Sequence, residues 1–383
     1  AANGATAAGA RNLAPTPAPP APATATKDAK AAAPATADEE GEPLRGAAAR
    51  IVQNMEASLR VPTATSFRNV PAKLLEVNRR IINGYLGRTR GGKVSFTHII
   101  GYAIVRAIHE TVPRMNSTYL EGADGKPRVI RHEHVGLGLA VDLEKADGSR
   151  SLLVPVIRDA DTLDFRAFWG TYEEIIRKVR SNKLTVDDFA GATITLTNPG
   201  TIGTKQSVPR LMPGQGVIVG VGAIDFPAEW RGADPEMLAD LGASKVITVT
   251  STYDHRIIQG AESGLFLKRL EELMLGADGF YDDIFTSLGV PYEAIKWRRD
   301  VNPIDHEQTA LEKQMAVATL IRVYRVRGHL IADLDPLRWK EPHMAPELDP
   351  ATYGLTIWDL DREFLTGGLG GHDKAILSEI LRV

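Results

Sequence analysis

Residues 250–260 read TSTYDHRIIQG, the end of an apolar, β-branched run that passes into a histidine, an amide side chain and a glycine. The run predicts a strand, and the helical pattern that begins at Glu262 predicts that His255 lies at a strand-to-helix corner. The unperturbed pKa of a histidine side chain is close to neutrality, so a histidine fixed at such a corner can act as a general base. A purely structural histidine is the alternative.

The charge and composition of the chain exclude several classes of protein. The 45 Lys and Arg residues are balanced by 48 Asp and Glu residues, so the chain lacks the basic excess that neutralises nucleic-acid phosphates. It has no cysteine, which excludes disulfides, thiolate metal sites and a cysteine nucleophile, and suits a reducing cytoplasm. No apolar run reaches the roughly 20 residues needed to span a bilayer. We therefore expect a cytoplasmic protein with no nucleic-acid partner and no membrane segment.

Three segments differ in composition. Residues 1–44 are dominated by Ala and Pro and have almost no large apolar side chains, so we expect a disordered, semi-rigid linker. Residues 45–300 alternate helical and strand patterns and are long enough for one large domain. The pattern restarts after Pro303, and residues 301–383 look like the opening of a second, incomplete module. The chain begins and ends in mid-pattern, so we interpret it as an excerpt of a longer protein.

The hydrophobic periodicity of residues 45–300 predicts an α/β domain. Apolar residues at helical spacing predict helices from Ala47 onward and at 71–86, 97–112, 164–181 and 262–275. β-branched and apolar runs predict strands at 135–143, 152–157, 194–197, 217–221 and 246–252. We expect helices on one side of a mixed sheet, as a two-layer sandwich, followed by a partial, mainly helical segment. Its first helix should span 307–329, with an apolar stripe of Leu311, Val317, Leu320, Ile321 and Tyr324.

A second candidate for chemistry lies at residues 193–200, which read TITLTNPG. Threonine alternates with apolar residues in this run, and β-propensity is its usual explanation. A hydroxyl at the end of the strand could also donate a hydrogen bond to the oxyanion formed on a thioester carbonyl. Thr197, directly before Asn198, is the threonine in that position.

These stretches together resemble the catalytic domain of 2-oxo acid dehydrogenase acyltransferases. That family carries a T-x-[ST]-N-type turn and a D-H-R-x-x-[DN]-G corner, which match residues 195–200 and 253–260. Further motifs agree in the same order, at 153–161, 183–189 and 213–220. The likeness covers about 45–290 and implies the chloramphenicol acetyltransferase-like fold. The family's Asp or Asn in the corner is Gln259 here, which is one methylene longer and cannot carry a negative charge.

The resemblance implies a mechanism and its residues. His255 would remove the proton from a thiol of coenzyme A or of dihydrolipoamide, and the thiolate would attack an acyl thioester. Thr197 would hydrogen-bond the tetrahedral oxyanion, and Gln259 could orient the imidazole or a neighbouring group. In the family the base and the hydroxyl come from neighbouring subunits of a trimer, so the resemblance also implies a homotrimer.

The same resemblance suggests three residues for substrate binding. Ser95 and His98, near a helix start, look like the acyl-pocket region of succinyl-transferring relatives, although helix capping and ordinary packing explain the pair as well. Asn198 is the third, because it directly follows the implied oxyanion donor.

Other motifs have simpler explanations. The glycines at 214–222 run into a strand without a following helix, which disfavours a dinucleotide loop. His132 and His134 could share a strand face, but a metal ion would need further ligands, and we expect no metal site. The basic run at 177–180 fits the exposed face of a helix, with contact to coenzyme A phosphates as the alternative.

Residues 324–330 and 334–337, YRVRGHL and LDPL, look like the beginning of the thiamine-dependent decarboxylating component of 2-oxoglutarate dehydrogenase. An acyltransferase core that runs directly into this component is similar to the fused 2-oxoglutarate dehydrogenase of some bacteria. Thiamine diphosphate and Mg would then be bound beyond this chain. We find no lipoylation pattern, so a lipoyl group would arrive on another protein. The implied partners are a lipoyl-bearing acyltransferase and dihydrolipoamide dehydrogenase of the 2-oxo acid dehydrogenase complexes.

Two functional hypotheses follow. In the first, succinyl moves between dihydrolipoamide and coenzyme A, with His255 as base and Thr197 as oxyanion donor. In the second, the same fold is a catalytically silent trimeric scaffold for the attached decarboxylase, its chemistry lost through Gln259. A chloramphenicol-acetyltransferase or condensation-domain function ranks last, because those enzymes prefer a His-His pair where Asp254 and His255 stand here.

Overall fold

The computed structural model describes residues 43–89, 91–144, 150–300, 307–332 and 345–382. By its contacts the chain divides into two units, Ala1–Leu44 and Arg45–Val383, and the helices and strands of the described residues lie in the second. The Ala/Pro segment that we expect to be a linker lies outside the described residues, apart from its last two positions.

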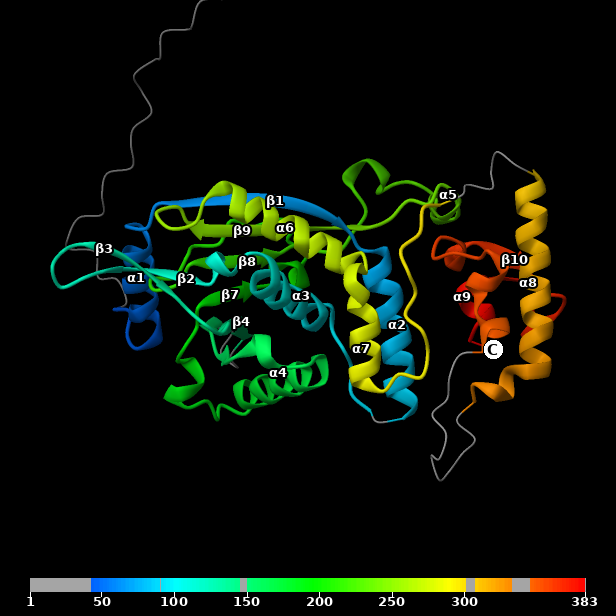
Figure 1. Ribbon diagram of the computed structural model, residues 1–383, viewed down its shortest axis with the longest axis horizontal. Helices are drawn as coiled ribbons and strands as arrows, with labels where there is room; N and C mark the ends of the chain where they lie inside the picture. The colour runs from blue at the N-terminus through cyan, green and yellow to red at the C-terminus, as the bar shows by residue number, and fades with distance from the viewer. Residues whose placement is uncertain (1–42, 90, 145–149, 301–306, 333–344, 383) are drawn as a thin grey trace, which may run out of the picture. The chain divides into compact units, whose positions relative to one another are not determined.

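A seven-stranded mixed sheet forms the centre of the domain (Figure 1). Its strand order is β1-β9-β8-β7-β4-β5, and β6 also pairs with β4. β7 is parallel to both β4 and β8, whereas β9 runs antiparallel to β8 and to β1. The strands are β1 (Thr63–Pro71), β4 (Leu137–Glu144), β5 (Arg150–Leu153), β6 (Val156–Ile157), β7 (Ile194–Thr197), β8 (Val217–Val221) and β9 (Val246–Asp254).

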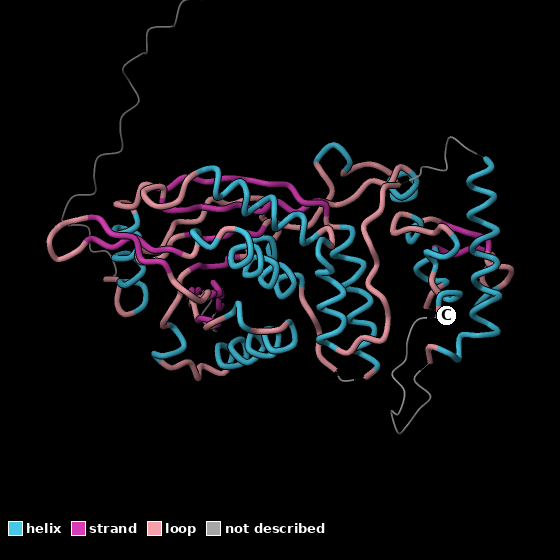
Figure 2. Tube along the Cα trace, viewed as in Figure 1, coloured by secondary structure: helices cyan, strands magenta, loops and turns pink. Residues whose placement is uncertain are grey.

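Helices cover one face of this sheet, as the two-layer arrangement expected from the sequence requires (Figure 2). Side chains alternate along a strand, and Ile247, Val249 and Tyr253 of β9 are buried in the core on this side. Gly101 lies against Leu196 of β7, where a β-carbon would be only 3.3 Å from the leucine. The helices are α1 (Ala47–Ser58), α2 (Lys73–Arg88), α3 (Phe96–Thr111), α4 (Phe165–Arg180), α5 (Pro235–Asp240), α6 (Gly260–Met274) and α7 (Phe280–Leu288).

The other face of the sheet is lined by hydroxyl and amide side chains. Thr65 on β1 and Thr252 on β9 are hydrogen-bonded at 2.8 Å, and Thr195 on β7 donates to Gln215 at 2.5 Å. These groups are buried or half-buried, because residues 198–216 cross over this face. The oxyanion candidate at the end of β7 belongs to the same face.

Several elements of the domain lack a clear sequence signal. β1 has few large apolar residues, yet it pairs with β9 along its whole length. The hairpin of β2 (Ser117–Glu121) and β3 (Pro127–Arg131) forms a separate two-stranded sheet, and all of β3 is exposed. α7 follows α6 after a sharp turn made by two glycines with positive φ, Gly276 and Gly279. The run at 152–157 is divided into β5 and β6 around Pro155, which has no N–H to donate to a ladder.

The start of α3 is held by a reciprocal capping box. The Ser95 hydroxyl accepts the N–H of His98 at 3.3 Å, and the Ser95 N–H donates to His98 Nδ1 at 3.1 Å. Nδ1 therefore carries no proton, and Nε2–H faces Glu173 Oε1 at 3.2 Å. His98 is only 2% exposed, and this burial lowers its pKa to about 4. The imidazole is neutral, so its contact with Glu173 is a hydrogen bond rather than an ion pair.

The segment after residue 306 packs around one long helix, α8 (Glu307–Arg327), which ends in a 3₁₀ turn. Val317, Leu320 and Ile321 are buried, as the expected stripe requires. Leu311 is exposed, contrary to the prediction, and Lys313 is buried in its place because it forms an ion pair. The remaining elements are short: β10 (Glu363–Leu365), β11 (Lys374–Ile376) and α9 (Leu377–Ile380).

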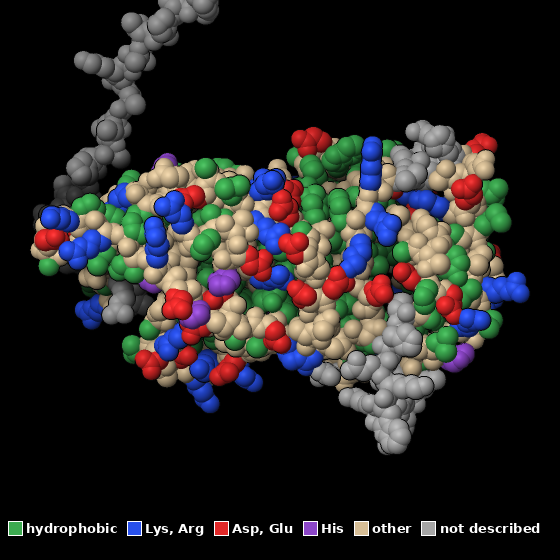
Figure 3. Space-filling view, viewed as in Figure 1, with side chains coloured by type: hydrophobic (Ala, Val, Ile, Leu, Met, Phe, Trp, Pro, Cys, Tyr) green, Lys and Arg blue, Asp and Glu red, His purple; other side chains and the backbone are tan. Residues whose placement is uncertain are grey.

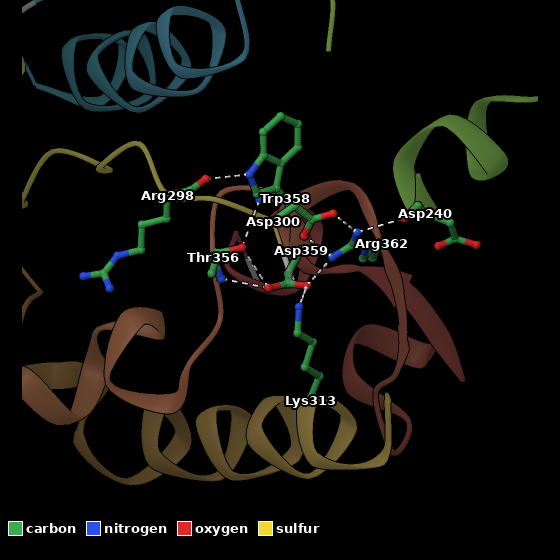
Figure 4. A network of polar contacts seen from close by, with 8 residues as sticks. All are labelled: Asp240, Arg298, Asp300, Lys313, Thr356, Trp358, Asp359 and Arg362. Atoms are coloured by element: carbon green, nitrogen blue, oxygen red, sulfur yellow. Dashed lines mark hydrogen bonds and ion pairs between the residues drawn. The ribbon is translucent and has the colours of Figure 1, made fainter. Parts of the chain in front are cut away.

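A buried ionic network centres on Arg362, which is 4% exposed (Figure 4). Its guanidinium donates to Asp300 at 2.8 and 3.1 Å and to Asp359 at 2.9 Å. Lys313 donates to the same oxygen of Asp359 at 2.5 Å. Burial alone would raise the pKa of Asp359, but hydrogen bonds from Lys313, the Thr356 N–H and Arg362 hold it below its ordinary value.

Further contacts join this network to residues 45–300. The same guanidinium donates to the carbonyl of Asp240 at the end of α5 (Figure 4). Trp358 Nε1 donates to the carbonyl of Arg298 at 2.8 Å, and Lys73 at the start of α2 pairs with Asp361. The segment is therefore held by charged and polar anchors from α2, α5 and the stretch before residue 301.

Removing the guanidinium should destabilise the protein strongly. In Arg362→Met, the buried carboxylate of Asp359 and the half-buried carboxylate of Asp300 lose a partner. We therefore expect the free energy of unfolding to fall by about 3–5 kcal/mol. Lys374→Met, which removes an exposed pair with Glu363, should change it by less than about 1 kcal/mol. Urea denaturation monitored by tryptophan fluorescence measures the free energy of unfolding of both variants. If Arg362→Met lost as little stability as Lys374→Met, the network would have no structural role.

His98 should make stability depend on pH below neutrality. As pH falls through 6.5, unfolded histidine takes up a proton, but the folded imidazole resists until about pH 4. Stability from this group is therefore complete above pH 6.5 and decreases by roughly 3 kcal/mol toward pH 4. His98→Asn should flatten the curve in that window, whereas His329→Asn, at an exposed position, should leave it unchanged. Chemical unfolding between pH 4.5 and 7 is the measurement, and an unaltered slope in His98→Asn would refute the assignment.

Candidate active site

His255 lies in the turn directly after β9, and hydrogen bonds hold both its backbone and its ring. Its N–H donates to the carbonyl of Pro62 at 2.9 Å, next to the start of β1. Its Nδ1 lies 3.1 Å from the carbonyl oxygen of Ile258. A carbonyl only accepts, so Nδ1 carries the ring proton and Nε2 keeps a free lone pair. The exposed side chain thus has the tautomer that a general base requires.

The residues on either side of His255 hold the corner in place. The buried Asp254 accepts hydrogen bonds from the Arg256 side chain at 2.6 to 3.2 Å and from its backbone N–H at 3.0 Å. The guanidinium carbon of Arg256 lies 3.6 Å from the ring centroid of Tyr119, in the middle of β2. The sequence analysis did not single out Arg256 or Tyr119, and the place of Arg256 in the D-H-R motif was the available signal.

Gln259 occupies the N-cap position of α6. Its backbone N–H donates to Glu262 Oε2 at 2.8 Å, which anchors the first turn of the helix. Its side chain is exposed. The ring of His255 is oriented by the Ile258 carbonyl, so within one copy the imidazole does not depend on the Gln259 amide for its orientation.

Four other predicted residues gather at the opposite end of the sheet. Thr197 ends β7 and is half-buried on the face away from the helices. Asn198 donates to the Thr97 hydroxyl at 2.8 Å, which links the turn after β7 to the first turn of α3. Ser95 and His98 lie on that same turn. Because their polar groups are engaged in the capping box, the geometry favours capping as their principal role.

Within one chain, His255 and Thr197 are far apart. Thr197 pairs with Gly220 on β8, and Gly220 pairs with Thr250 on β9. His255 follows Thr250 by five residues, which places it about 17 Å farther along the strands. A base must lie within hydrogen-bond reach of the proton that it removes. A single copy therefore cannot present both groups to one reacting thioester.

A cavity of about 270 Å³ opens beside the starts of β4 and β7, at the end of the sheet where β9 leads to His255. Its wall combines imidazole, guanidinium, carboxylate and hydroxyl groups with two glycines. It is lined by His132, Glu133, His134, Gly136, Arg158, Asp159, Gly191 and Thr193.

Behind this cavity, a buried carboxylate lies between two histidines, an arrangement that the sequence analysis missed. Asp161 Oδ2 lies 2.9 Å from His134 Nδ1 and 3.5 Å from His109 Nδ1. Its other oxygen accepts the N–H of Val135 at 2.5 Å. The hydrogen bond to Asp161 raises the pKa of His134. Asp161 thus anchors the start of β4, and among the described residues no group of three or more His, Asp or Glu could hold a metal ion.

The surface has the mixed charge expected from the composition. On the face shown in Figure 3, Lys and Arg side chains are interspersed with Asp and Glu side chains. In the described part of the chain, no helix has both the length and the apolar character needed to cross a membrane.

Comparison with known proteins places these features in a family. The family described as 2-oxoacid dehydrogenases acyltransferase (catalytic domain) matches residues 36–278. The multifunctional 2-oxoglutarate metabolism enzymes of Mycobacterium sp. (strain JLS) and Mycolicibacterium vanbaalenii are each 54% identical to this chain, over 347 and 346 residues. These alignments cover 90% of this chain and 27% of the relatives, so the chain spans about a quarter of their length.

Two solved structures confirm the expected fold. Dihydrolipoamide acetyltransferase from Azotobacter vinelandii is 28% identical, with a TM-score of 0.51 over 61% of this chain and 90% of that one. A truncated catalytic core of the 2-oxoacid dehydrogenase multienzyme complex from Thermoplasma acidophilum is 27% identical, with a TM-score of 0.51 over 63% of this chain and 99% of that one. The chain therefore belongs to the 2-oxoacid dehydrogenase acyltransferase family.

Proposed function

We propose that this chain transfers a succinyl group from dihydrolipoamide, carried on another protein, to coenzyme A. The observation that carries the proposal is the His255 corner, where the ring donates through Nδ1 to Ile258 and leaves Nε2 free as a base. The relatives' name refers to 2-oxoglutarate metabolism. Oxidative decarboxylation of 2-oxoglutarate leaves a four-carbon succinyl unit, which supports succinyl as the transferred group.

The reaction needs one proton carrier and one oxyanion donor. His255 Nε2 takes the proton from the coenzyme A thiol, and the thiolate attacks the carbonyl carbon of succinyl-dihydrolipoamide. Thr197 of a neighbouring copy donates a hydrogen bond to the oxyanion, a contact typically worth about 2.7–4 kcal/mol in the transition state. The tetrahedral intermediate then expels the dihydrolipoamide sulfur, which takes the proton back from the imidazolium.

We propose that the chain forms a homotrimer in which neighbouring copies share each site, as the resemblance implies. Each copy offers His255 at one end of its sheet and Thr197 at the other, so a closed ring of copies completes every site. Asn198, Ser95 and His98 lie at the Thr197 end, and in this proposal they shape the acyl pocket of the site that Thr197 joins.

The longer relatives support a proposal for the wider protein. We propose that residues 45–300 form the acyltransferase domain, that residues 1–44 are a linker, and that residues 301–383 begin a thiamine-dependent 2-oxoglutarate decarboxylase module. Thiamine diphosphate and Mg²⁺ would be held beyond this chain. A lipoyl-bearing acyltransferase and dihydrolipoamide dehydrogenase would be the partners, in the cytoplasm.

A silent trimeric scaffold is the second candidate, and Gln259 is the residue that favours it. The amide has replaced the family's shorter Asp or Asn in the corner motif. The orientation of the His255 ring by a backbone carbonyl weighs against a loss of function, because that bond does not involve the replaced side chain.

Subunit complementation tests the shared site. His255→Ala should lower the rate of succinyl-coenzyme A formation by about 10² to 10⁴-fold, and Thr197→Val by about 10² to 10³-fold. The two variants are then refolded together at equal amounts. A site is complete only where a Thr197→Val copy supplies His255 and the adjacent His255→Ala copy supplies Thr197. This arrangement occurs at about one site in four, so about a quarter of the activity should return. No recovery in mixed oligomers would contradict sharing, and a fully active His255→Ala would refute the enzymatic proposal. Acetyl-dihydrolipoamide in the same assay tests the acyl preference.

Gln259→Asn tests the departure from the family motif. Because the Ile258 carbonyl already orients the imidazole, we expect the turnover rate to stay within a few-fold of the wild-type rate. Gln259→Ala should behave similarly, since the cap bond is made by the backbone N–H and the Glu262 side chain. A turnover rate about a hundredfold higher in Gln259→Asn would have the size expected when a general base is restored. That result would show that glutamine had silenced the site, as the scaffold proposal requires.

A further inference from the structure

The β2–β3 hairpin is separate from the main sheet and projects from the edge of the domain (Figure 1). Its base is firmly attached. Asn116 Nδ2 donates to the carbonyls of His132 and His134 at 3.1 and 2.8 Å, closing the hairpin where it leaves the domain. Gly216 packs so closely on the Ser117 carbonyl that a β-carbon would lie 2.0 Å from its oxygen. The hairpin is therefore held in position at its base, while its outer part is in solvent.

The outer part carries large apolar side chains in solvent. Leu120 is 47% exposed, Val129 51% and Ile130 41%. The register pairs Thr118 with Ile130 and Leu120 with Arg128, so Leu120 and Ile130 lie on one face of the hairpin. A two-stranded hairpin is marginally stable alone in water, and an exposed apolar strand invites pairing. This face therefore has the character of a docking surface.

A second copy of this chain is the occupant that the site requires. Tyr119, one residue before Leu120, stacks on Arg256, which directly follows His255. The hairpin thus leaves the domain beside His255, the proposed general base. Under the proposed function, the copy that supplies Thr197 must approach this same end of the sheet, where the hairpin projects.

The Thr197 end of the sheet offers a matching apolar surface. In the loop after Thr197, Ile202 is 71% exposed and Val208 is 59% exposed. The neighbours of Val208 lie over the sheet next to Thr197: a β-carbon on Gly220, the register partner of Thr197, would be 3.3 Å from Ser207 and 3.6 Å from Pro209. The apolar loop and the oxyanion donor therefore belong to one surface.

We infer that the Leu120–Ile130 face of the hairpin of one copy docks on the Ile202–Val208 loop of the next copy. The contact joins two different surfaces, so it is heterologous and closes into a ring when the rotation allows. It rests on the proposed function, because the shared site is what identifies the partner as a second copy. Each hairpin would reach across the interface and carry the neighbour's Thr197 toward its own His255.

Cysteine cross-linking tests the contact directly, because the chain has no cysteine of its own. Leu120→Cys and Val208→Cys are prepared separately, refolded together and oxidised with copper phenanthroline. We expect a disulfide-linked pair of chains that contains one of each variant. Leu120→Cys mixed with Leu365→Cys, whose leucine is exposed on β10, should give none. A protein that is oligomeric but shows no cross-link between positions 120 and 208 would overturn the inference.

Charge placed on either surface should separate the copies. Ile130→Asp and Val208→Asp should each shift the mass measured by light scattering from an oligomer to a single chain and lower activity at least 100-fold. Leu365→Asp should do neither. An unchanged mass in Ile130→Asp would reject the hairpin as the contact, even if complementation between His255→Ala and Thr197→Val succeeded. Failed complementation with successful cross-linking would reject the shared site and keep the contact.

Discussion

The antiparallel direction of β9 is the constraint on which the site depends. β7 and β8 run the same way, so Thr197 lies at the carboxyl end of the pair, and β9 returns in the opposite direction to deliver His255 to the other end. The separation of about 17 Å follows from strand geometry alone and does not depend on any side chain. One sheet thus offers a base at one end and an oxyanion donor at the other. A reaction that uses both groups therefore requires the sheet of a second copy of the chain.

Two kinds of polar anchor keep these ends in place. At the His255 end, Asp254 and Arg256 hold the turn, and the Ile258 carbonyl selects the ring tautomer. At the Thr197 end, Asn198 ties the strand to α3, whose first turn is capped by Ser95 and His98. Buried polar groups must be satisfied by such contacts, because an unmade hydrogen bond costs more than a made one contributes. The same rule explains why the two terminal nitrogens of the buried Arg362 guanidinium are paired with Asp300, Asp359 and the Asp240 carbonyl.

The local patterns in the sequence were sufficient for most of the secondary structure. β-branched runs predicted the inner strands, and helical spacing predicted α2, α3, α4, α6 and α8. β1 could not be predicted, because it is recruited by backbone pairing with β9 instead of by its own apolar residues. Leu311 shows the opposite case, in which an apolar residue that the helical pattern assigns to a buried stripe lies in solvent. Hydrophobicity identifies surfaces that need a partner, but it does not say whether that partner belongs to the same chain.

Sequence alone determined the chemical groups of the candidate site: a histidine at a strand-to-helix corner, a threonine at a strand end, and an amide where the family has a shorter side chain. These properties are local, because spacing and residue type are enough to specify them. Tertiary structure decided the tautomer of His255, the capping role of His98 and the distance between base and oxyanion donor. Each depends on atoms that are remote in sequence or on the direction of a strand within the sheet. The hydrophobic periodicity of the chain does not say at which end of the sheet each of these groups lies.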